Sequence, residues 1–238
     1  MNFSVSYCGF LSLLLAQHIN ANSECSDVHV VFARGSTELP GLGICGEPFV
    51  SSLTSNLNGF SVSSYAVDYE ASATQLSAGP GATDMTNHVV VVANQCPSTV
   101  FVMGGYSQGA SVTDIAIGID TVLGQGETIP EALAPRIKAV VTFGNPLFLF
   151  GETIESSSQL YRSKVVEFCE DGDPVCGNGI NPLAHIMYPS DGSVTSAAEK
   201  AAALVNKLLN CAGPKLGLLT EVIVNVMLCE FSNGAMLT

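Results

Sequence analysis

The chain contains one serine in a setting that suits a nucleophile, within the pentapeptide Gly105-Tyr106-Ser107-Gln108-Gly109. An apolar, β-prone run, Thr99 to Met103, precedes the pentapeptide, and a helix-like stretch, Ala110 to Ile119, follows it. A strand, a tight G-x-S-x-G turn and a helix form a nucleophile elbow, in which the glycines permit the sharp turn and the serine stands proud of the sheet. We therefore predict that Ser107 is a catalytic nucleophile.

A serine hydroxyl becomes nucleophilic beside a base, and the base needs a carboxylate to orient it. In the elbow fold, these three groups follow one another along the chain as serine, acid and histidine. His185 is the only histidine after Ser107 and is therefore the predicted base. The acidic candidates that lie between them near His185 are Glu167, Glu170, Asp171 and Asp173.

Two cysteines, Cys169 and Cys176, enclose most of these acids and could be closed by a local disulfide. In the chain-entropy model, such a short ring stabilises by about 2.5 kcal/mol. The disulfide would also hold a carboxylate within reach of a histidine. The alternative is a disulfide that only stabilises a surface loop. Gly172 and Pro174 flank Asp173 and favour it as the acid, but spacing alone leaves the choice against Asp171 open.

Acyl transfer also requires donors for the developing oxyanion. The amide of Gln108, the residue after the nucleophile, is one predicted donor, and the second should follow an early strand. Ser36 lies in Arg34-Gly35-Ser36, directly after the apolar run Val28 to Ala33, and offers both an N–H and a hydroxyl. The structural alternatives are a turn cap for Ser36 and a buried ion pair for Arg34.

The elements that must position these residues alternate along the chain. Alternating strands and helices predict a parallel sheet in a three-layer α/β/α fold, with ligands at the carboxyl ends of the strands. Ser36, Ser107 and the acidic loop all follow predicted strands and should meet at one edge. The predicted strands are 28–33, 61–69, 100–104, 136–143 and 164–169, the helices are 48–57, 84–94, 110–119 and 194–210, and 129–133 is a short helical turn.

The amino-acid composition and the net charge indicate which kinds of binding partner are unlikely for this chain. The chain is 47% hydrophobic and 12% charged, with a mean hydropathy of +0.38, which predicts a large core. A net charge of −13 disfavours nucleic acid and anionic membranes as partners and favours neutral substrates. The cysteines form no C-x-x-C pair, so no zinc site is expected, and no other metal or organic cofactor is implied.

The number of cysteines and the apolar N-terminal segment together predict that the protein is secreted. Residues 1–23 are interpreted as a secretory signal, with an apolar core at Phe10 to Ala16, and no stretch is long enough for stable insertion into a membrane. Residues 24–210 are the predicted domain, and 211–238 are a tail that a disulfide between Cys211 and Cys229 could clip. Removal of Cys8 from the eight cysteines leaves seven, which fits three disulfides and one free thiol.

Taken together, these residues resemble the cutinase family, which also includes acetylxylan esterases. The motifs that carry the resemblance are Ala33 to Glu38, Gly105 to Ala110, Phe143-Gly144-Asn145-Pro146, Cys169 to Cys176, and His185 with Tyr188. The resemblance implies a compact α/β hydrolase with a five-stranded parallel sheet and no large lid. It also implies Ser107 as nucleophile, Asp173 as acid, His185 as base, Ser36 and Gln108 as oxyanion donors, and the disulfides Cys25–Cys96 and Cys169–Cys176.

We therefore expect a secreted, monomeric serine esterase that acts on cutin-type polyester and on short- to medium-chain acyl esters. Leu39, Leu42, Leu183 and Ile186 either form an apolar rim for such a substrate or pack inward. An acetylxylan esterase is the alternative on the same fold, although the absence of Trp disfavours a sugar polymer. A secreted binding protein without turnover is the alternative from another class.

Overall fold

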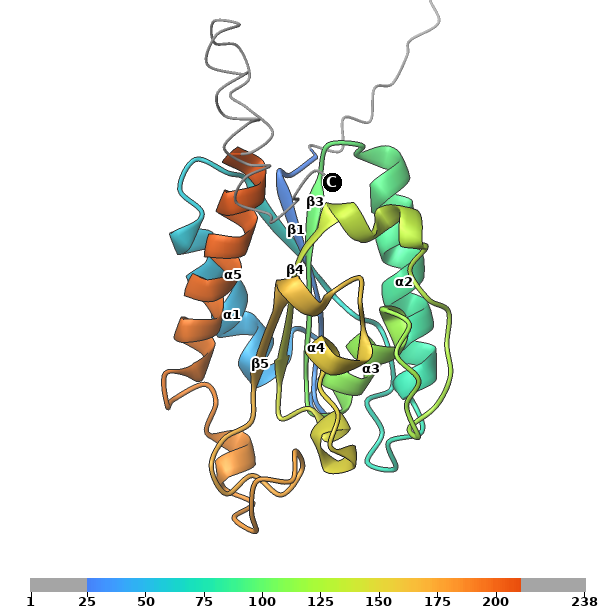
Figure 1. The fold of residues 1–238 in the computed structure, drawn as a ribbon, viewed down its shortest axis with the longest axis vertical. Coiled ribbons are helices and arrows are strands. Elements are labelled where there is room, and N and C mark those ends of the chain that lie inside the picture. Colours follow the sequence, from blue (N-terminus) through green and yellow to red (C-terminus); the bar gives the residue numbers. More distant parts are fainter. Residues whose placement is uncertain (1–24, 211–238) are drawn as a thin grey trace, which may run out of the picture.

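A five-stranded sheet lies at the centre of the computed structural model, which describes residues 25–210 (Figure 1). All of its strand pairs are parallel, in the order β2-β1-β3-β4-β5. This arrangement confirms the predicted parallel sheet. The strands are β1 (Val28–Ala33), β2 (Val62–Ala66), β3 (Val100–Tyr106), β4 (Ile137–Phe143) and β5 (Val165–Phe168).

Helices cover both faces of this sheet, so the fold has the three layers that the alternation of elements predicts (Figure 1). Helices α1 (Gly43–Asn56) and α5 (Ser193–Asn210) pack on one face, and α2 (Ala78–Gln95) and α3 (Gln108–Ala116) pack on the other. The remaining helices are short: α4 (Ile154–Ser157) and the 3₁₀ turns η1 (Glu131–Arg136), η2 (Pro146–Phe150), η3 (Arg162–Lys164) and η4 (Ala184–Ile186).

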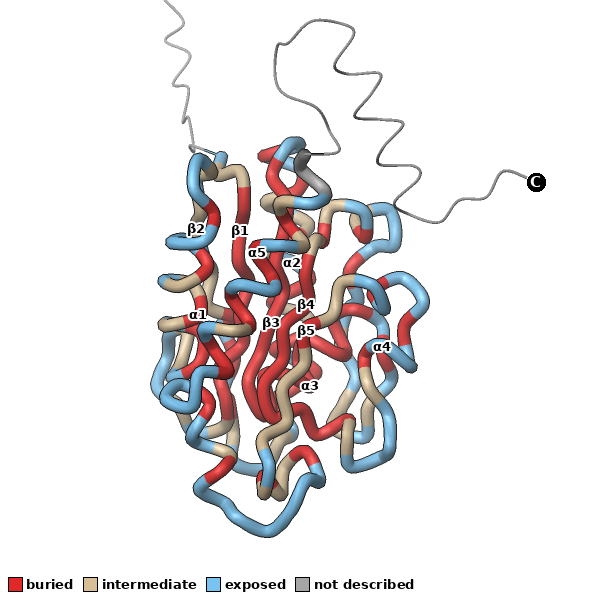
Figure 2. The backbone as a smooth tube through the Cα atoms, turned by 60° about the vertical axis from the view of Figure 1, so that its left-hand side comes forward, coloured by how far each residue is buried: buried red, intermediate tan, exposed pale blue. Residues whose placement is uncertain are grey.

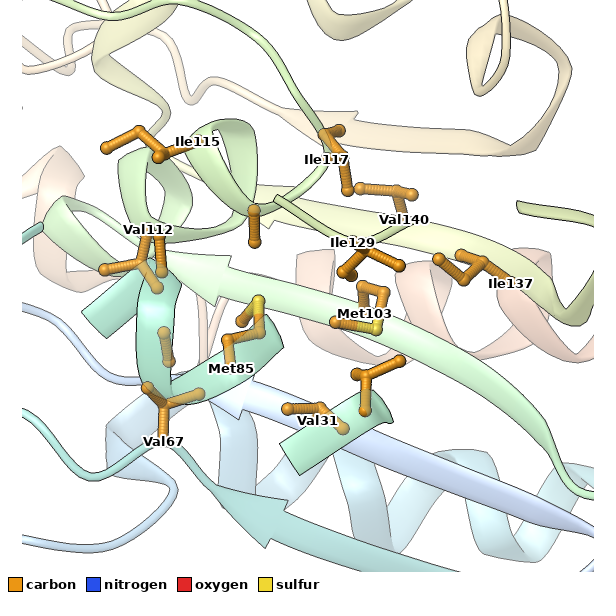
Figure 3. Close-up of a cluster of buried hydrophobic side chains, with 14 of the residues drawn as sticks. Val31, Val67, Met85, Met103, Val112, Ile115, Ile117, Ile129, Ile137 and Val140 are labelled. Carbon is orange, nitrogen blue, oxygen red and sulfur yellow. The ribbon is translucent and has the colours of Figure 1, made fainter. Parts of the chain in front are cut away.

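Each face of the sheet has its own apolar core. Every residue of β1 and β3 is buried, as expected for central parallel strands that are covered on both sides (Figure 2). On the α2–α3 face, Val31, Met103 and Val140 from three adjacent strands pack with Met85 and Val112 from the two helices (Figure 3). These cores immobilise the central strands, and the site residues follow those strands directly.

Helices α1 and α2 begin five and six residues earlier than their sequences predict. Helix α1 begins at Gly43 rather than Pro48, because a Glu38 carboxylate oxygen accepts the Ile44 N–H at 2.7 Å and satisfies the first turn. Helix α2 begins at Ala78 rather than Asp84, although two glycines and a proline lie in its first turn. A Cβ atom at Gly79 would lie 2.1 Å from the carbonyl oxygen of Gln125, so close packing against that loop outweighs low helix propensity here.

Several expectations concern residues outside the described range. The predicted signal of residues 1–23, with Cys8, and the tail of residues 211–238, with Cys211 and Cys229, belong to this group. Within residues 25–210, none of the helices is both long enough and apolar enough to cross a bilayer.

A pair of histidines joins the sheet to α2. His29 Nε2 on β1 lies 2.8 Å from His88 Nε2 on α2, and His29 Nδ1 lies 2.6 Å from Ser63 Oγ on β2. The Tyr65 ring stacks on His88 with 3.5 Å between ring centroids. Burial and the neighbouring His88 lower the pKa of His29 to about 4, and burial also lowers the pKa of His88. The folded protein therefore keeps His29 neutral at pH values where the unfolded chain would protonate it.

We expect the His29 cluster to make the fold sensitive to acid. The pKa of His29 in the folded state lies below its ordinary value of 6.5, so its contribution to stability is complete above pH 6.5 and is lost as the pH falls toward 4. The loss amounts to about 3 kcal/mol at pH 4. Urea unfolding of wild type and His29→Gln at pH 7 and pH 4.5 checks this. The variant should lose less stability between the two pH values, and equal losses would contradict the prediction.

Candidate active site

The predicted nucleophile lies at the junction of β3 and α3, near the carboxyl edge of the sheet. Ser107 has φ +57° and ψ −121°, a backbone conformation that costs a non-glycine residue about 1–3 kcal/mol. The neighbouring strand holds it there, because the Ser107 N–H donates to the Phe143 carbonyl oxygen at 2.9 Å. The strand–turn–helix context that the sequence predicts is present.

The two glycines of the pentapeptide are required by close backbone approach. A Cβ atom at Gly105 would lie 1.9 Å from the Gly109 carbonyl oxygen, and one at Gly109 would lie 2.0 Å from the Ala33 carbonyl oxygen. Larger residues would therefore push α3 away from β3 and from the end of β1. The glycines bring Ser107 and the segment after Ala33 to the same place.

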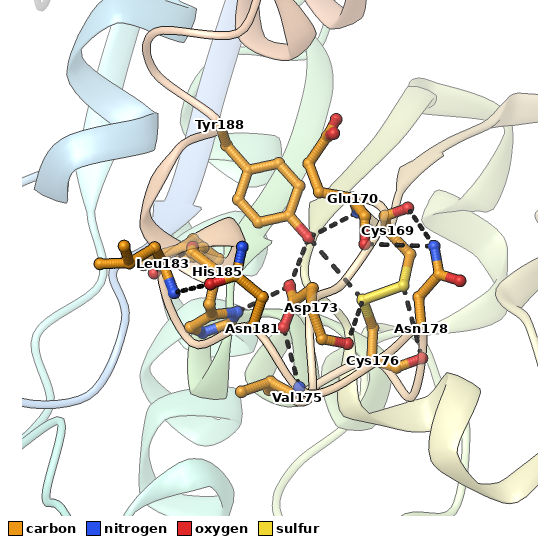
Figure 4. A network of polar contacts seen from close by, with 11 residues as sticks. Cys169, Glu170, Asp173, Val175, Cys176, Asn178, Asn181, Leu183, His185 and Tyr188 are labelled. Atoms are coloured by element: carbon orange, nitrogen blue, oxygen red, sulfur yellow. Dashed lines mark hydrogen bonds and ion pairs between the residues drawn. A yellow bond between two sulfur atoms is a disulfide. The ribbon is translucent and has the colours of Figure 1, made fainter.

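The predicted acid and base are in contact (Figure 4). Asp173 Oδ2 lies 2.8 Å from His185 Nδ1, and Asp173 is fully buried whereas the His185 side chain is 14% exposed. The second carboxylate oxygen, Oδ1, accepts the Val175 N–H at 2.8 Å. The Asp173 carboxylate therefore binds Nδ1 of His185. This contact leaves Nε2, the other ring nitrogen, available to exchange a proton with a nucleophile.

The other acidic candidates make different contacts. Asp171 is exposed, and its Oδ1 accepts from Asn178 Nδ2 at 3.0 Å. Glu170 Oε1 accepts from Ser193 Oγ at 2.7 Å, and Glu167 Oε1 accepts from the Ile154 N–H at 3.2 Å. Of the four candidates, Asp173 alone forms a hydrogen bond or ion pair with His185 among the described residues.

Tyr106, the residue before Ser107, contacts both the ring and the main chain of His185. The two rings stack with 4.9 Å between centroids, and the Tyr106 hydroxyl donates to the His185 carbonyl oxygen at 2.7 Å. Burial and the neighbouring Cys45, Glu38 and Asp173 raise the pKa of Tyr106, so its hydroxyl remains a donor.

Gly144 provides the space for the acid and the base. A Cβ atom at this position, which has φ +57°, would lie 2.7 Å from His185 Cε1 and 3.1 Å from Asp173 Oδ2. Gly144 directly follows β4, the strand between β3 and β5. The bare backbone after β4 therefore lets the base lie against the same sheet edge as Ser107.

The predicted oxyanion residues are braced by a loop that the sequence analysis did not single out, residues 71–77. Gln75 Nε2 donates to Ser36 Oγ at 2.9 Å, and Ser77 Oγ donates to Gln108 Oε1 at 3.4 Å. The Gln108 amide belongs to the first residue of α3 and therefore has no carbonyl partner within the helix. The only local signal for this loop is its cluster of small polar residues, which is typical of any turn.

Among the described residues, Arg34 does not form the buried ion pair that was its structural alternative. Its guanidinium donates to three main-chain carbonyl oxygens, those of Glu38, Val67 and Tyr69, and lies 5.0 Å from the centre of the Tyr69 ring. These bonds join the loops after β1 and β2. The expectation was wrong because main-chain acceptors, which no side-chain pattern reveals, fill the site around this arginine.

The four expected rim residues divide into two groups. Leu39, Leu183 and Ile186 are exposed, by 84%, 64% and 53%, whereas Leu42 is half-buried and packs against the core on the α1–α5 face. Leu76, in the loop that braces Ser36, is 77% exposed and was not anticipated. The inward packing that the sequence left open therefore applies to Leu42 alone.

Both disulfides that the resemblance implied are present. Cys169–Cys176 closes the acidic loop, and Cys25–Cys96 joins the start of β1 to the end of α2 (Figure 4 shows the first). Cys45 is the free cysteine within the described residues. It is fully buried, and burial raises the pKa of its thiol, so it has little thiolate character.

A parallel α/β sheet with a strained serine at a strand–helix turn and a buried Asp–His pair at the same edge defines a serine hydrolase of the α/β-hydrolase type. The chain belongs to the cutinase family, because the family model "Cutinase" matches residues 24–205. The domain is therefore a serine carboxylic ester hydrolase, a class that the family model and the named relatives support over the non-catalytic alternative.

Named relatives agree with this assignment. The chain is 55% identical over 183 residues to the "Cutinase" of Kineococcus radiotolerans, a match that covers 76% of this chain and 62%, less than two thirds, of that protein. It is 40% identical over 185 residues to the "Carboxylesterase Culp1" of Mycobacterium tuberculosis, and that match covers 75% of this chain and 81% of that protein.

Solved structures share the fold. A Trichoderma reesei cutinase in complex with a phosphonate inhibitor has a TM-score of 0.58 at 31% identity and covers 78% of this chain and 77% of its own. An acetylxylan esterase has a TM-score of 0.65 at 26% identity and covers 78% of this chain and 99% of its own.

We expect the Cys169–Cys176 disulfide to support activity more than it supports the fold. The Cys169→Ser/Cys176→Ser variant should lose about 2.5 kcal/mol of stability and at least tenfold in kcat, because the loop that holds Asp173 is released. Ester hydrolysis and circular dichroism at a temperature where the variant is folded check this.

The matched control is Cys25→Ser/Cys96→Ser, whose cysteines are 71 residues apart. This variant should lose about 4 kcal/mol of stability but retain the wild-type kcat while it is folded. Equal values of kcat in the two variants would contradict the prediction.

Proposed function

We propose that this protein is a secreted esterase that hydrolyses cutin-type polyester and short- to medium-chain acyl esters through an acyl-enzyme. The observation that carries the proposal is the Asp173–His185 pair, stacked on the tyrosine that precedes the strained Ser107. All of the groups in the proposed mechanism come from one chain, so a monomer is sufficient. Two disulfides suit an oxidising, extracellular compartment.

In the proposed mechanism, Ser107 Oγ attacks the ester carbonyl carbon while His185 Nε2 accepts the serine proton. Asp173 keeps the Nδ1 proton on the imidazole and stabilises the imidazolium that forms. His185 then returns the proton to the leaving alcohol. In the second half, His185 takes a proton from the water that attacks the acyl-enzyme carbonyl carbon. It then gives this proton to Ser107 Oγ as the bond between Ser107 and the acyl group breaks, and the acid product leaves.

The oxyanion is assigned to the Gln108 N–H and to Ser36. Gln75 is the donor in its hydrogen bond with Ser36 Oγ, so that bond leaves the hydroxyl proton of Ser36 free to point at the substrate. A preorganised donor of this kind contributes about 3 kcal/mol to the stabilisation of the transition state.

The substrate proposal rests on the exposed apolar residues near the site. Leu39, Leu76, Leu183 and Ile186 are each more than half exposed and come from three loops at the carboxyl edge of the sheet. Aliphatic side chains suit a waxy polyester surface better than they suit sugar rings, which favour aromatic platforms. The surrounding acidity, with a net charge of −13, also favours an uncharged ester.

An acetylxylan-type activity is the second candidate, because an acetylxylan esterase shares this fold with a TM-score of 0.65. The two candidates differ in the acyl group that the site accepts, acetyl or a longer chain.

We expect the hydrolysis of p-nitrophenyl esters, from acetate to palmitate, to peak at butyrate or longer. Ser107→Ala should reduce kcat by at least 10⁴-fold on every ester, because the nucleophile is removed. A strict preference for acetate would favour the acetylxylan candidate. An active Ser107→Ala variant would contradict the assignment of the nucleophile.

Gln75 tests the assignment of the oxyanion donors. In Gln75→Glu, a carboxylate of nearly the same shape can only accept a hydrogen bond, so it should take up the Ser36 hydroxyl proton and lower kcat about 100-fold with little change in KM. Thr74→Glu adds the same charge at an exposed position of the same loop and should lower kcat far less. Equal effects of the two substitutions would show that charge alone is responsible.

A further inference from the structure

Tyr188 makes a contact with the acid that the triad itself does not require. Its hydroxyl lies 2.6 Å from Asp173 Oδ2, the oxygen that also binds His185 Nδ1 (Figure 4). The side chain is fully buried, and its ring packs edge-on against the rings of Tyr106 and His185. One carboxylate oxygen therefore serves two side-chain partners at once.

The direction of the Tyr188 hydrogen bond follows from its neighbours. The Glu170 N–H donates to the Tyr188 hydroxyl oxygen at 3.1 Å, so the hydroxyl oxygen is already an acceptor. Asp173 as a carboxylate can only accept, and the hydroxyl proton must therefore point at Oδ2. Burial and the Asp173 hydrogen bond raise the pKa of Tyr188, so the hydroxyl keeps this proton throughout the working range of an esterase.

We propose that Tyr188 is a positioning residue whose hydroxyl proton partly neutralises the oxygen of Asp173 that faces His185, and thereby sets the pH range in which His185 acts as a base. This inference rests on the proposed roles of Asp173 and His185. Tyr188 contacts neither the nucleophile nor the substrate in this scheme; it acts through the carboxylate.

The surroundings of the pair explain why such a donor matters. The titratable groups nearby are Glu170 in the acidic loop, Glu38 after β1, Cys45 on α1, Asp191 before α5, and Tyr106 on β3. None of these groups is a cation. Among the side chains of the described residues, Tyr188 and His185 are the two that donate to the Asp173 carboxylate.

The sign of the effect follows from the shared oxygen. Without the Tyr188 proton, the negative charge on Oδ2 acts on His185 undiminished and holds a proton on the ring more strongly. The ring then becomes protonated, and inactive as a base, at a higher pH. A residue that only filled space would lower stability or kcat without moving the acid limb of the pH–rate profile.

The test compares kcat/KM for p-nitrophenyl butyrate from pH 4.5 to 9 in wild type and Tyr188→Phe, with thermal unfolding measured in parallel. We expect the acid limb of the variant to move upward by roughly 0.5–1 pH unit, the shift that corresponds to the net contribution of one typical intramolecular hydrogen bond. We also expect kcat to fall about tenfold with KM nearly unchanged. An acid limb at the wild-type position overturns the inference.

Tyr106→Phe is the matched control. It removes the hydroxyl of a buried tyrosine that stacks on the His185 ring, a hydroxyl that binds a main-chain carbonyl rather than the carboxylate. Its acid limb should stay at the wild-type midpoint, whatever happens to kcat. An equal upward shift in this control would show that general loosening of the site is responsible, and would overturn the inference.

A second variant keeps the ring and the hydrogen bond, in case Tyr188→Phe does not fold. Site-specific replacement of Tyr188 by 3,5-difluorotyrosine makes the phenol a stronger donor and should move the acid limb to lower pH, opposite to Tyr188→Phe. A shift upward, or none, overturns the inference.

Fluorophosphonate labelling of wild type at Ser107 separates this inference from the proposed function on which it rests. An unlabelled, inactive wild type overturns both the proposed function and this inference. An active wild type whose variants have unmoved acid limbs overturns this inference alone.

Discussion

A fully buried carboxylate is the constraint around which this site is arranged. Removing Asp173 from water costs several kcal/mol unless hydrogen-bond donors replace its solvation. The Val175 N–H, His185 Nδ1 and the Tyr188 hydroxyl supply those donors from two segments of the chain. The segment that carries Asp173 and the segment that carries His185 are therefore held together by the carboxylate that we propose as the acid of the triad.

The parallel sheet brings this acid–base pair to the same edge as the predicted nucleophile and the predicted oxyanion residue. Ser36 follows β1, Ser107 follows β3, and Asp173 lies in the loop after β5, so three strands deliver the parts to one edge. Backbone contacts set the spacing: Gly109 packs against the end of β1, and Gly144 gives His185 its place beside β4. Both positions leave no room for a Cβ atom, so the distances between the catalytic parts do not depend on flexible side chains.

The sheet and the position of the nucleophile could be predicted from the sequence. Each strand is a short apolar run, and the turn at Ser107 has the pattern G-x-S-x-G. His185 was predicted from chain order, whereas Asp173 was favoured by its neighbours Gly172 and Pro174 and by the family resemblance. The structure separates Asp173, which contacts His185, from the exposed Asp171. What the sequence could not predict are contacts made across the fold. The early start of α1 depends on Glu38, the bonds of Arg34 go to main-chain oxygens, and Gln75 braces Ser36 from a loop with no distinctive pattern.

The buried thiol of Cys45 has a consequence for how the protein acquires its covalent structure. The five cysteines of the described residues form two disulfides and leave one free thiol, and an unfolded chain could pair them incorrectly. Cys169 and Cys176 are seven residues apart and close a ring at little entropic cost, so this bond can form before the rest of the fold. Cys45 escapes exchange only after α1 has docked and covered it. The same packing that builds the core on this face therefore also protects the native pairing of Cys25 with Cys96 from exchange with Cys45.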